Sequence, residues 1–277
     1  MTDITVATWN VHQAIDRNPE SRRATWEYLR TQIAPSVALL QEVGVLPDWL
    51  SNSISVGGPY GYGTAVVAPD ARLEEVSTVV SRYSKSGKQS TIARTVSPSH
   101  VAARVSLPGA EPFTAVSLYG RIVDQIYAQT TNLHLIADLT PIFDAPAYNG
   151  LLVVGGDLNA YDNGPRVDKV SRRRWQLIFD LYESFGLVNL LKVRRDAERA
   201  AGVPPMTGCL CGLGDACYHV ETWRSNRSKP SVWCIDYLFA SKEMAARVLG
   251  GVEPWAAGHA DAWHFSDHSP LLATFRL

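Results

Sequence analysis

The hydrophobic residues of this chain fall into short runs that predict strands. Ile4–Trp9 alternates apolar and polar positions, whereas Val37–Leu40 and Leu151–Val154 are continuous apolar runs of the kind found in buried strands. Polar residues end each of these runs, as expected where a strand enters a loop. Comparable runs predict further strands at Tyr62–Ala68, Val101–Leu107, Phe113–Leu118, Ile235–Ala240 and Pro270–Leu277.

Between these runs, apolar residues recur at helical spacing. Asn18 and Pro19 suit an N-cap and a first helical residue, and Pro35 ends the pattern that they open. Trp175, Ile178, Phe179 and Tyr182 would share one face of a later helix. The spacing predicts helices over about 20–33, 123–143 and 171–185.

The order of these elements favours a mixed α/β sandwich. Pro108–Pro112 is a good hairpin connection between two of the strands, so the sheets are not purely parallel. There are few long helices for the number of strands. No repeat or Pro/Gly linker divides the chain, and we expect one domain over 1–277 with an inserted Cys-rich loop at about 203–233.

Composition narrows the class of protein further. The chain has 277 residues, of which 46% are hydrophobic and 19% charged, which excludes a disordered chain. No stretch reaches the roughly 18 apolar residues of a membrane span, and no signal peptide is visible at Met1. We therefore expect a cytoplasmic protein, monomeric by default.

Taken alone, the net charge of −1 argues against a nucleic-acid-binding protein, but the total hides a local excess of basic residues. Residues 166–229 hold 12 basic and 7 acidic side chains. Arg172, Arg173 and Arg174 in this block predict either a solvated helix face or a patch that follows a phosphate backbone. Trp223 and Trp233 could stack on bases or pack in the core.

All four cysteines lie within 26 residues, and the first 208 residues have none. Cys209, Cys211, Cys217 and His219 supply the four ligands that structural zinc prefers, although their spacing differs from the familiar C-x2-C pattern. The alternative is that the cysteines bind no metal. A zinc site here would fix the inserted loop beside the strand at Ile235.

Polar residues with catalytic potential follow the predicted strands. Rigid scaffolds present functional groups at such strand ends, although Asn and Asp are also common turn formers. Carboxylates gathered at one place repel one another unless a cation or a proton lies between them, and Mg2+ prefers oxygen ligands. The set therefore suits metal-assisted attack of water on a phosphate ester. It comprises Asn10, Glu42, Tyr119, Asp157, Asn159, Asp236, Asp267 and His268.

Six short motifs occur in an order that resembles the endonuclease/exonuclease/phosphatase superfamily, which includes DNase I and the exonuclease III-type enzymes. They are TWN, LLQE, SLYG, GGDLNA, IDYLFAS and SDHSP, and they extend from Thr8 to the final strand. Each motif is weak alone, but six in order are specific. The resemblance implies a four-layer α/β/β/α sandwich of two mixed, largely antiparallel sheets, with the active site at one edge.

The resemblance also implies roles for individual residues. Glu42 would bind the metal, Mg2+ or Mn2+, with Asn10 beside it and Asp267 as a second carboxylate on the metal side. Asp157 would orient or deprotonate the attacking water. Asn159 would hold this water and the phosphate.

The remaining roles concern the phosphate. His268 would bind a phosphate oxygen, while Asp236 accepts a hydrogen bond from its far nitrogen. Tyr119 occupies a place where relatives use Tyr or His near the phosphate. Removing one such electrostatic donor typically costs about 3–4 kcal/mol in the transition state.

Two positions depart from the resemblance. Some nuclease relatives carry Asp where this chain has His12, which could alter the metal geometry or donate to phosphate. Gly120-Arg121-Ile122 replaces the Pro-Asn type of loop that follows the Tyr in abasic-site endonucleases. This difference argues against abasic-site specificity, and it leaves Arg121 as a candidate substrate contact.

Three hypotheses follow from the sequence. The first is a metal-dependent phosphodiesterase acting on nucleic acid, DNA or RNA, as an endonuclease. The second is a phosphatase or phosphodiesterase for a small phosphorylated molecule or lipid headgroup, because specificity lies in loops that the catalytic motifs do not define. The third is an inactive binding module, which the complete carboxylate and His set disfavours.

Overall fold

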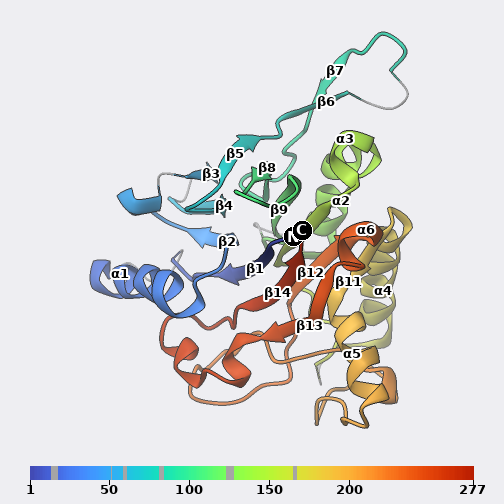
Figure 1. Cartoon of the computed structure of the whole chain (residues 1–277). Coiled ribbons are helices and arrows are strands. Elements are labelled where there is room, and N and C mark those ends of the chain that lie inside the picture. The colour runs from blue at the N-terminus through green and yellow to red at the C-terminus, as the bar shows by residue number, and fades with distance from the viewer. Residues whose placement is uncertain (14–17, 51, 59–60, 81–83, 123–127, 165–166) are drawn as a thin grey trace.

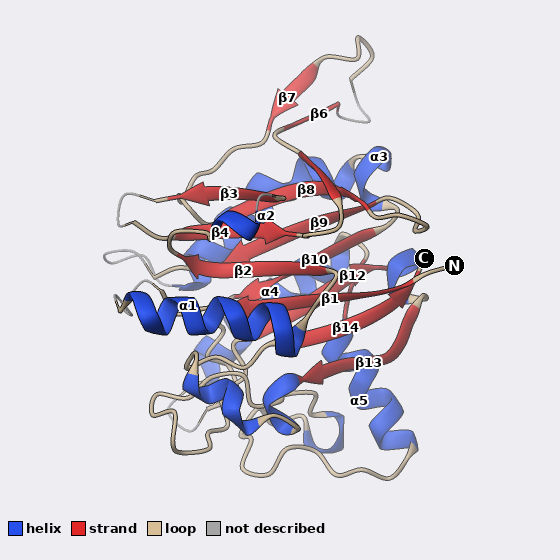
Figure 2. Ribbon diagram, turned by 60° about the vertical axis from the view of Figure 1, so that its left-hand side comes forward, coloured by secondary structure: helices blue, strands red, loops and turns tan. Residues whose placement is uncertain are grey.

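Two six-stranded sheets packed face to face form the centre of the molecule (Figures 1 and 2). The computed structural model describes residues 1–13, 18–50, 52–58, 61–80, 84–122, 128–164 and 167–277. Helices lie on both outer sides of the sheet pair. This arrangement confirms the predicted α/β/β/α sandwich.

The first sheet is built around β1 (Asp3–Asn10). This strand pairs antiparallel with β14 (Leu271–Arg276) and parallel with β2 (Val37–Val43). The parallel register sets Asn10 opposite Gln41, so the polar ends of both strands lie at one edge. The full order is β13 (Val248–Pro254), β14, β1, β2, β4 (Gly63–Val67) and β3 (Ser53–Gly57).

The second sheet is built around β10 (Leu152–Asp157), which is parallel to β9 (Phe113–Tyr119) and antiparallel to β12 (Asp236–Ser241). Asp157 pairs with both Tyr119 and Asp236 across these two ladders. Three candidate residues therefore lie side by side at one edge. The order is β11 (Leu187–Asn189), β12, β10, β9, β8 (His100–Ser106) and β5 (Arg72–Glu75).

The helices cover the outer faces of the sheets. Against the first sheet lies α1 (Pro19–Tyr28), which continues as a π-helical turn at Leu29–Ile33 and buries Trp26 and Tyr28 against Trp9 and Leu40. Against the second sheet lie α2 (Ala128–Asp144) and α4 (Lys169–Ser184). Shorter helices are α3 (Pro146–Asn149), α5 (Leu190–Ala200) and α6 (Lys242–Ala245), and α5 packs on β12 and β13.

The eight predicted strands and the helices at 20–33 and 171–185 are confirmed. The start of the helix expected over 123–143 lies outside the described residues, and α2 occupies the rest. The pattern missed α5 because only Leu190, Leu191 and Arg195 are buried in this highly charged helix. It also missed β13, where a Gly-Gly bulge interrupts the apolar run.

A two-stranded arm, β6 (Thr78–Val80) and β7 (Gln89–Thr91), projects from the sandwich beyond β5 (Figures 1 and 2). Among the helices that the structure describes, none combines the length and apolar character needed to span a membrane.

Candidate active site

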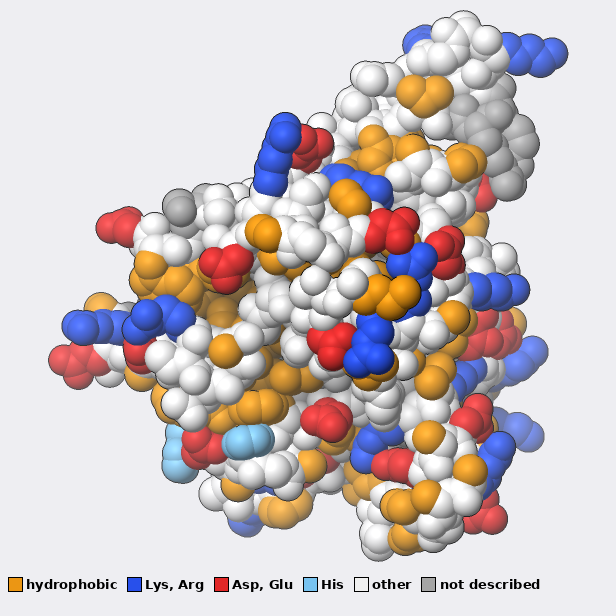
Figure 3. Space-filling model, viewed as in Figure 1, with side chains coloured by type: hydrophobic (Ala, Val, Ile, Leu, Met, Phe, Trp, Pro, Cys, Tyr) orange, Lys and Arg blue, Asp and Glu red, His pale blue; other side chains and the backbone are white. Residues whose placement is uncertain are grey.

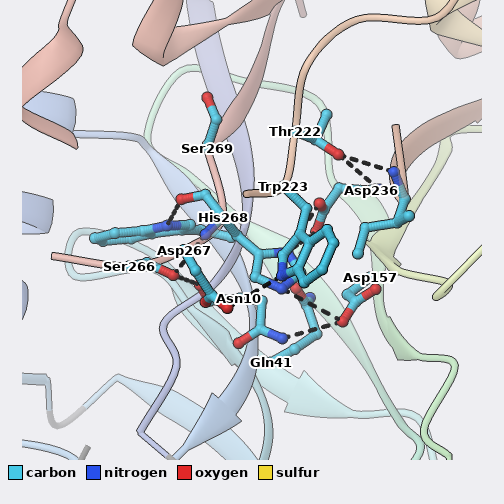
Figure 4. A network of polar contacts seen from close by, with 12 residues as sticks. Asn10, Gln41, Asp157, Thr222, Trp223, Asp236, Ser266, Asp267, His268 and Ser269 are labelled. Atoms are coloured by element: carbon cyan, nitrogen blue, oxygen red, sulfur yellow. Dashed lines mark hydrogen bonds and ion pairs between the residues drawn. The ribbon is translucent and has the colours of Figure 1, made fainter. Parts of the chain in front are cut away.

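The polar ends of the central strands of both sheets meet in one hydrogen-bonded network (Figure 4). Asn10 on β1 lies at its centre. Its Nδ2 donates to Glu42 Oε1 at 3.2 Å and to Asp157 Oδ2 at 3.0 Å, which joins β2 of one sheet to β10 of the other. Its Oδ1 accepts from the backbone N–H of His12 at 2.9 Å.

Glu42 reaches this network because β2 contains a bulge. Gln41 pairs with Thr64 and Val43 pairs with Gly63, so Glu42 is the extra residue, with φ at 53°. Val43 then takes the outer apolar position that strict alternation would give to Glu42. The bulge therefore turns the Glu42 carboxylate inward, toward Asn10.

Tyr119, at the end of β9, holds the same carboxylate. Its hydroxyl donates to Glu42 Oε1 at 2.7 Å. Burial raises the pKa of this hydroxyl, and the neighbouring carboxylates of Glu42 and Asp157 raise it further, so the hydroxyl remains a donor. Asn10 and Tyr119 both donate to Oε1 of Glu42. Its buried Oε2 has no hydrogen-bond partner among the described residues.

Asp157 is only 1% exposed at the end of β10. Burial raises its pKa to about 7; the charge of His268 opposes this rise, and Asp236 adds to it. The turn that follows supplies hydrogen bonds, since Asn159 donates its backbone N–H to Asp157 Oδ1 at 2.8 Å and its Nδ2 to Oδ2 at 3.2 Å. Asn159 adopts a left-handed φ of 49° to do so.

His268 and Asp236 form a buried pair. His268 Nδ1 lies 2.9 Å from Asp236 Oδ2, and its Nε2 points toward Asp157 Oδ2 at 3.9 Å. Burial alone would lower the pKa of His268, but the charges of Asp236 and Asp157 outweigh it and raise the pKa to about 10. His268 is therefore a cation at neutral pH, with Nε2 free of Asp236 and available to a ligand.

Asp267 lies close to two side chains of the site. His12 Nδ1 lies 2.8 Å from Oδ1, and Trp223 Nε1 donates to Oδ2 at 3.0 Å. Burial alone would raise its pKa, but the hydrogen bond from His12 and the charge of His268 hold it at about 2. Asp267 therefore stays ionised, and its contact with His12 makes His12 part of the site.

Aromatic side chains lie beside this network. Tyr161 donates its hydroxyl to Asn159 Oδ1 at 3.2 Å. Its ring meets those of Trp223 and Trp233 edge to face, with centroids 6.0 and 5.3 Å apart. All three are partly exposed, so neither tryptophan is a plain core residue.

The candidate arginines contact backbone carbonyls or lie exposed on α4. Arg172 donates to the carbonyls of Gly164 and Val167. Arg173 and Arg174 are exposed on α4, and within the described ranges no hydrogen bond or ion pair joins them to the network. Arg121 is buried and donates to the Ser97 carbonyl at 3.1 Å.

The structure thus brings together nine of the residues singled out in the sequence. They are Asn10, His12, Glu42, Tyr119, Asp157, Asn159, Asp236, Asp267 and His268. Sequence reasoning missed Thr222, whose Oγ1 accepts from the backbone N–H of Asp236, and Ser266, whose Oγ accepts from the N–H of His268. Thr222 lies in a loop without a recognisable motif, so no signal in the sequence marks it. Ser266 opens the SDHSP motif, but the resemblance gives this serine no role of its own.

The profile of the Endonuclease/Exonuclease/phosphatase family matches residues 7–268. No curated sequence gives a significant match.

Several solved structures share the fold at low identity. An AP endonuclease from Leishmania major is 16% identical, with a TM-score of 0.64 over 99% of this chain and 88% of its own. An AP endonuclease from Archaeoglobus fulgidus is 16% identical, with a TM-score of 0.58 over 99% and 100%. The 3′ phosphatase NExo from Neisseria, bound to a product DNA hairpin, is 18% identical, with a TM-score of 0.59 over 99% and 100%.

Proposed function

This chain belongs to the endonuclease/exonuclease/phosphatase family, and from that premise we propose that it is a Mg2+-dependent phosphodiesterase that cleaves nucleic acid internally. The observation that carries the proposal is the hydrogen-bonded junction of Asn10, Glu42 and Asp157, beside which lies the His268–Asp236 pair. Each of these groups has a role in phosphate ester hydrolysis that its surroundings support.

Glu42 fits the part of a metal ligand. Its Oε2 is buried and has no hydrogen-bond partner within the described residues, an arrangement that is costly unless a cation balances it. Asn10 and Tyr119 orient the carboxylate through Oε1, and Asp267, which is ionised, is a second candidate ligand. These oxygen donors suit Mg2+ or Mn2+, and a bound ion would offset the charge of the phosphate.

Asp157 fits the general base. A carboxylate with a pKa near the working pH balances availability against basicity, and burial places Asp157 in that range. Hydrogen bonds from Asn10 and Asn159 fix its oxygens. Asp157 would accept a proton from the attacking water, while Asn159 holds the water and a phosphate oxygen.

His268 fits the phosphate-binding group. Asp236 holds the ring through Nδ1, so the protonated Nε2 can donate to a phosphate oxygen. This cation would also stabilise the charge that develops in the transition state.

The aromatic residues beside Asn159 favour a substrate that carries bases. Tyr161, Trp223 and Trp233 present partly exposed rings next to the group assigned to the phosphate. Base stacking on aromatic rings contributes about 1–3 kcal/mol per base. Solved relatives include AP endonucleases and a 3′ phosphatase bound to a DNA hairpin.

A cleavage panel tests the proposal. Single- and double-stranded DNA and RNA, linear and circular, are incubated with Mg2+ and the wild-type protein, with and without a chelator. We expect chelator-sensitive cleavage that includes circular substrates, because an endonuclease needs no chain end. The Asp157→Asn variant serves as the control for contaminating nucleases.

The same panel includes phosphate monoesters and small phosphodiesters. If these compounds are hydrolysed and nucleic acid is left uncleaved, the protein is instead a phosphatase or phosphodiesterase for small molecules. No hydrolysis of any substrate, together with no binding of Mg2+ in calorimetry, would support the inactive binding module instead.

A further inference from the structure

Four metal-binding side chains converge outside the site described above. Cys209, Cys211, Cys217 and His219 lie between α5 and β12, and their ligand atoms are all within 4.8 Å of one another. His219 Nδ1 lies 3.5 Å from Cys209 Sγ and 3.6 Å from Cys217 Sγ. Each of the four can therefore reach a common point.

These distances match a tetrahedral zinc site. With Zn–S bonds of about 2.3 Å and a Zn–N bond of about 2.0 Å, tetrahedral geometry separates sulfur from nitrogen by about 3.5 Å. Three sulfurs and one imidazole nitrogen form a Cys3His set. Such a set leaves no open coordination position for water, which is the property of structural rather than catalytic zinc.

The surroundings of the cluster support the same reading. His219 is 2% exposed, and its Nε2 lies 3.3 Å from Asp162 Oδ2, so a carboxylate backs the ring on the side away from the sulfurs. Metal-bound histidines commonly have such a partner, which fixes the tautomer that leaves the other nitrogen to the metal. Asn163 Nδ2 and the backbone N–H of Leu213 donate to the sulfurs of Cys209 and Cys211.

We propose that Cys209, Cys211, Cys217 and His219 bind one structural Zn2+ ion. The fourth cysteine, Cys234, is fully buried, lies outside the cluster and contacts the carbonyl of Asp236 instead.

The zinc site joins the inserted loop to the segment that carries the proposed base. Asp162 and Asn163, which contact His219 and Cys209, follow Asn159 and Tyr161 in the same turn. Asn163 also accepts from the N–H of Cys234, two residues before Asp236. Zinc here would therefore hold one wall of the site in place without contacting substrate.

Metal analysis of the purified protein tests the proposal. We expect about one zinc per chain after dialysis, and loss of that zinc in Cys217→Ser and His219→Asn. Cys234→Ala is the matched cysteine control and retains zinc. Asp157→Asn retains it too, so the result does not depend on whether the protein is a nuclease.

A second measurement covers the case in which the ligand variants fail to fold. Co2+ in place of Zn2+ gives wild-type protein the visible d–d bands of a tetrahedral site and a thiolate charge-transfer band in the near ultraviolet. Wild-type protein that contains no zinc and develops no such bands, or in which mass spectrometry finds a disulfide among the three cysteines, overturns the proposal.

Discussion

Left-handed backbone conformations mark the residues of the candidate site. His12, Glu42 and Asn159 are three of the four non-glycine residues with positive φ among those described, and all three belong to the polar network. Such a conformation costs on the order of 1 kcal/mol or more for a residue with a side chain, and it persists where surrounding contacts over-determine it. At this scale the sequence supplies the residue types, and the resemblance implies roles for them. Neither the sequence nor the resemblance reveals the left-handed backbone conformations that direct these side chains into the site.

At Asp157, replacement by Asn keeps the size of the side chain but removes its basicity. We expect kcat/KM for cleavage to fall by about 10³-fold, within the range that a general base contributes. Circular dichroism should remain that of wild type. The exposed Asp70→Asn is the matched control, with activity unchanged, and comparable activity in both variants would remove Asp157 from the proposed role.

The pair of His268 and Asp236 predicts a pH dependence. The pKa of His268 is raised to about 10, so the phosphate binding proposed for its protonated form should be lost only as the pH rises through that range. Asp236→Asn removes the charge that raises this pKa, so the alkaline limb of the pH–rate profile should move to lower pH. Activity profiles of both proteins from pH 6 to 11 provide the measurement; identical alkaline limbs would contradict the prediction.

At the scale of elements, continuous apolar runs such as those of β10 and β12 predict buried strands well because both sheet faces are covered. The pattern does not predict edge strands such as β3 and β5, because they are short and contain no buried residue. The bulge in β2 also escapes it. The sequence predicts a strand that ends at Leu40, whereas β2 continues to Val43, and only its pairing with β4 shows that Glu42 is an extra residue.

Gly156 allows β10 to pair closely with β9 next to the site. A Cβ atom at this residue would lie 1.8 Å from the backbone oxygen of Leu118. We expect Gly156→Ala to lower the free energy of unfolding by about 3 kcal/mol, since the neighbouring backbone must shift. Gly57→Ala on β3 meets nothing within 4 Å and should stay within about 0.5 kcal/mol of wild type in urea unfolding. Equal stability of the two variants would contradict this close approach.

At the scale of the whole molecule, the basic and acidic side chains nearly balance in number. Basic and acidic side chains are interspersed over the face in Figure 3, and the net charge is −1. Several arginines of the basic block serve the fold itself: Arg195 donates to the carbonyls of Val203 and Asp215, and Arg224 pairs with Glu221. The excess of basic residues over 166–229 therefore overstates the number of positive side chains that are available to bind a ligand.

This balance predicts weak salt dependence of nucleic-acid binding. A protein that neutralises about two or three phosphates loses roughly 10- to 40-fold in affinity between 50 and 200 mM salt, against 10³-fold or more for six to ten contacts. Fluorescence anisotropy of the Asp157→Asn variant on labelled DNA measures this without cleavage. A loss of 10³-fold or more would show an extended phosphate-binding surface.

The pairing of β1 with β14 has a practical consequence for handling the protein. Asp3 lies opposite Arg276, so both chain ends emerge together, whereas Asn10 and Leu271 lie at the other end of these strands. Eight residues of β1 span roughly 25 Å at about 3.3 Å each. A fluorophore, an affinity tag or a solid support attached at either end is therefore held a full strand length from the candidate site. A short linker between the two ends would close the chain into a ring and allow new ends to be opened elsewhere.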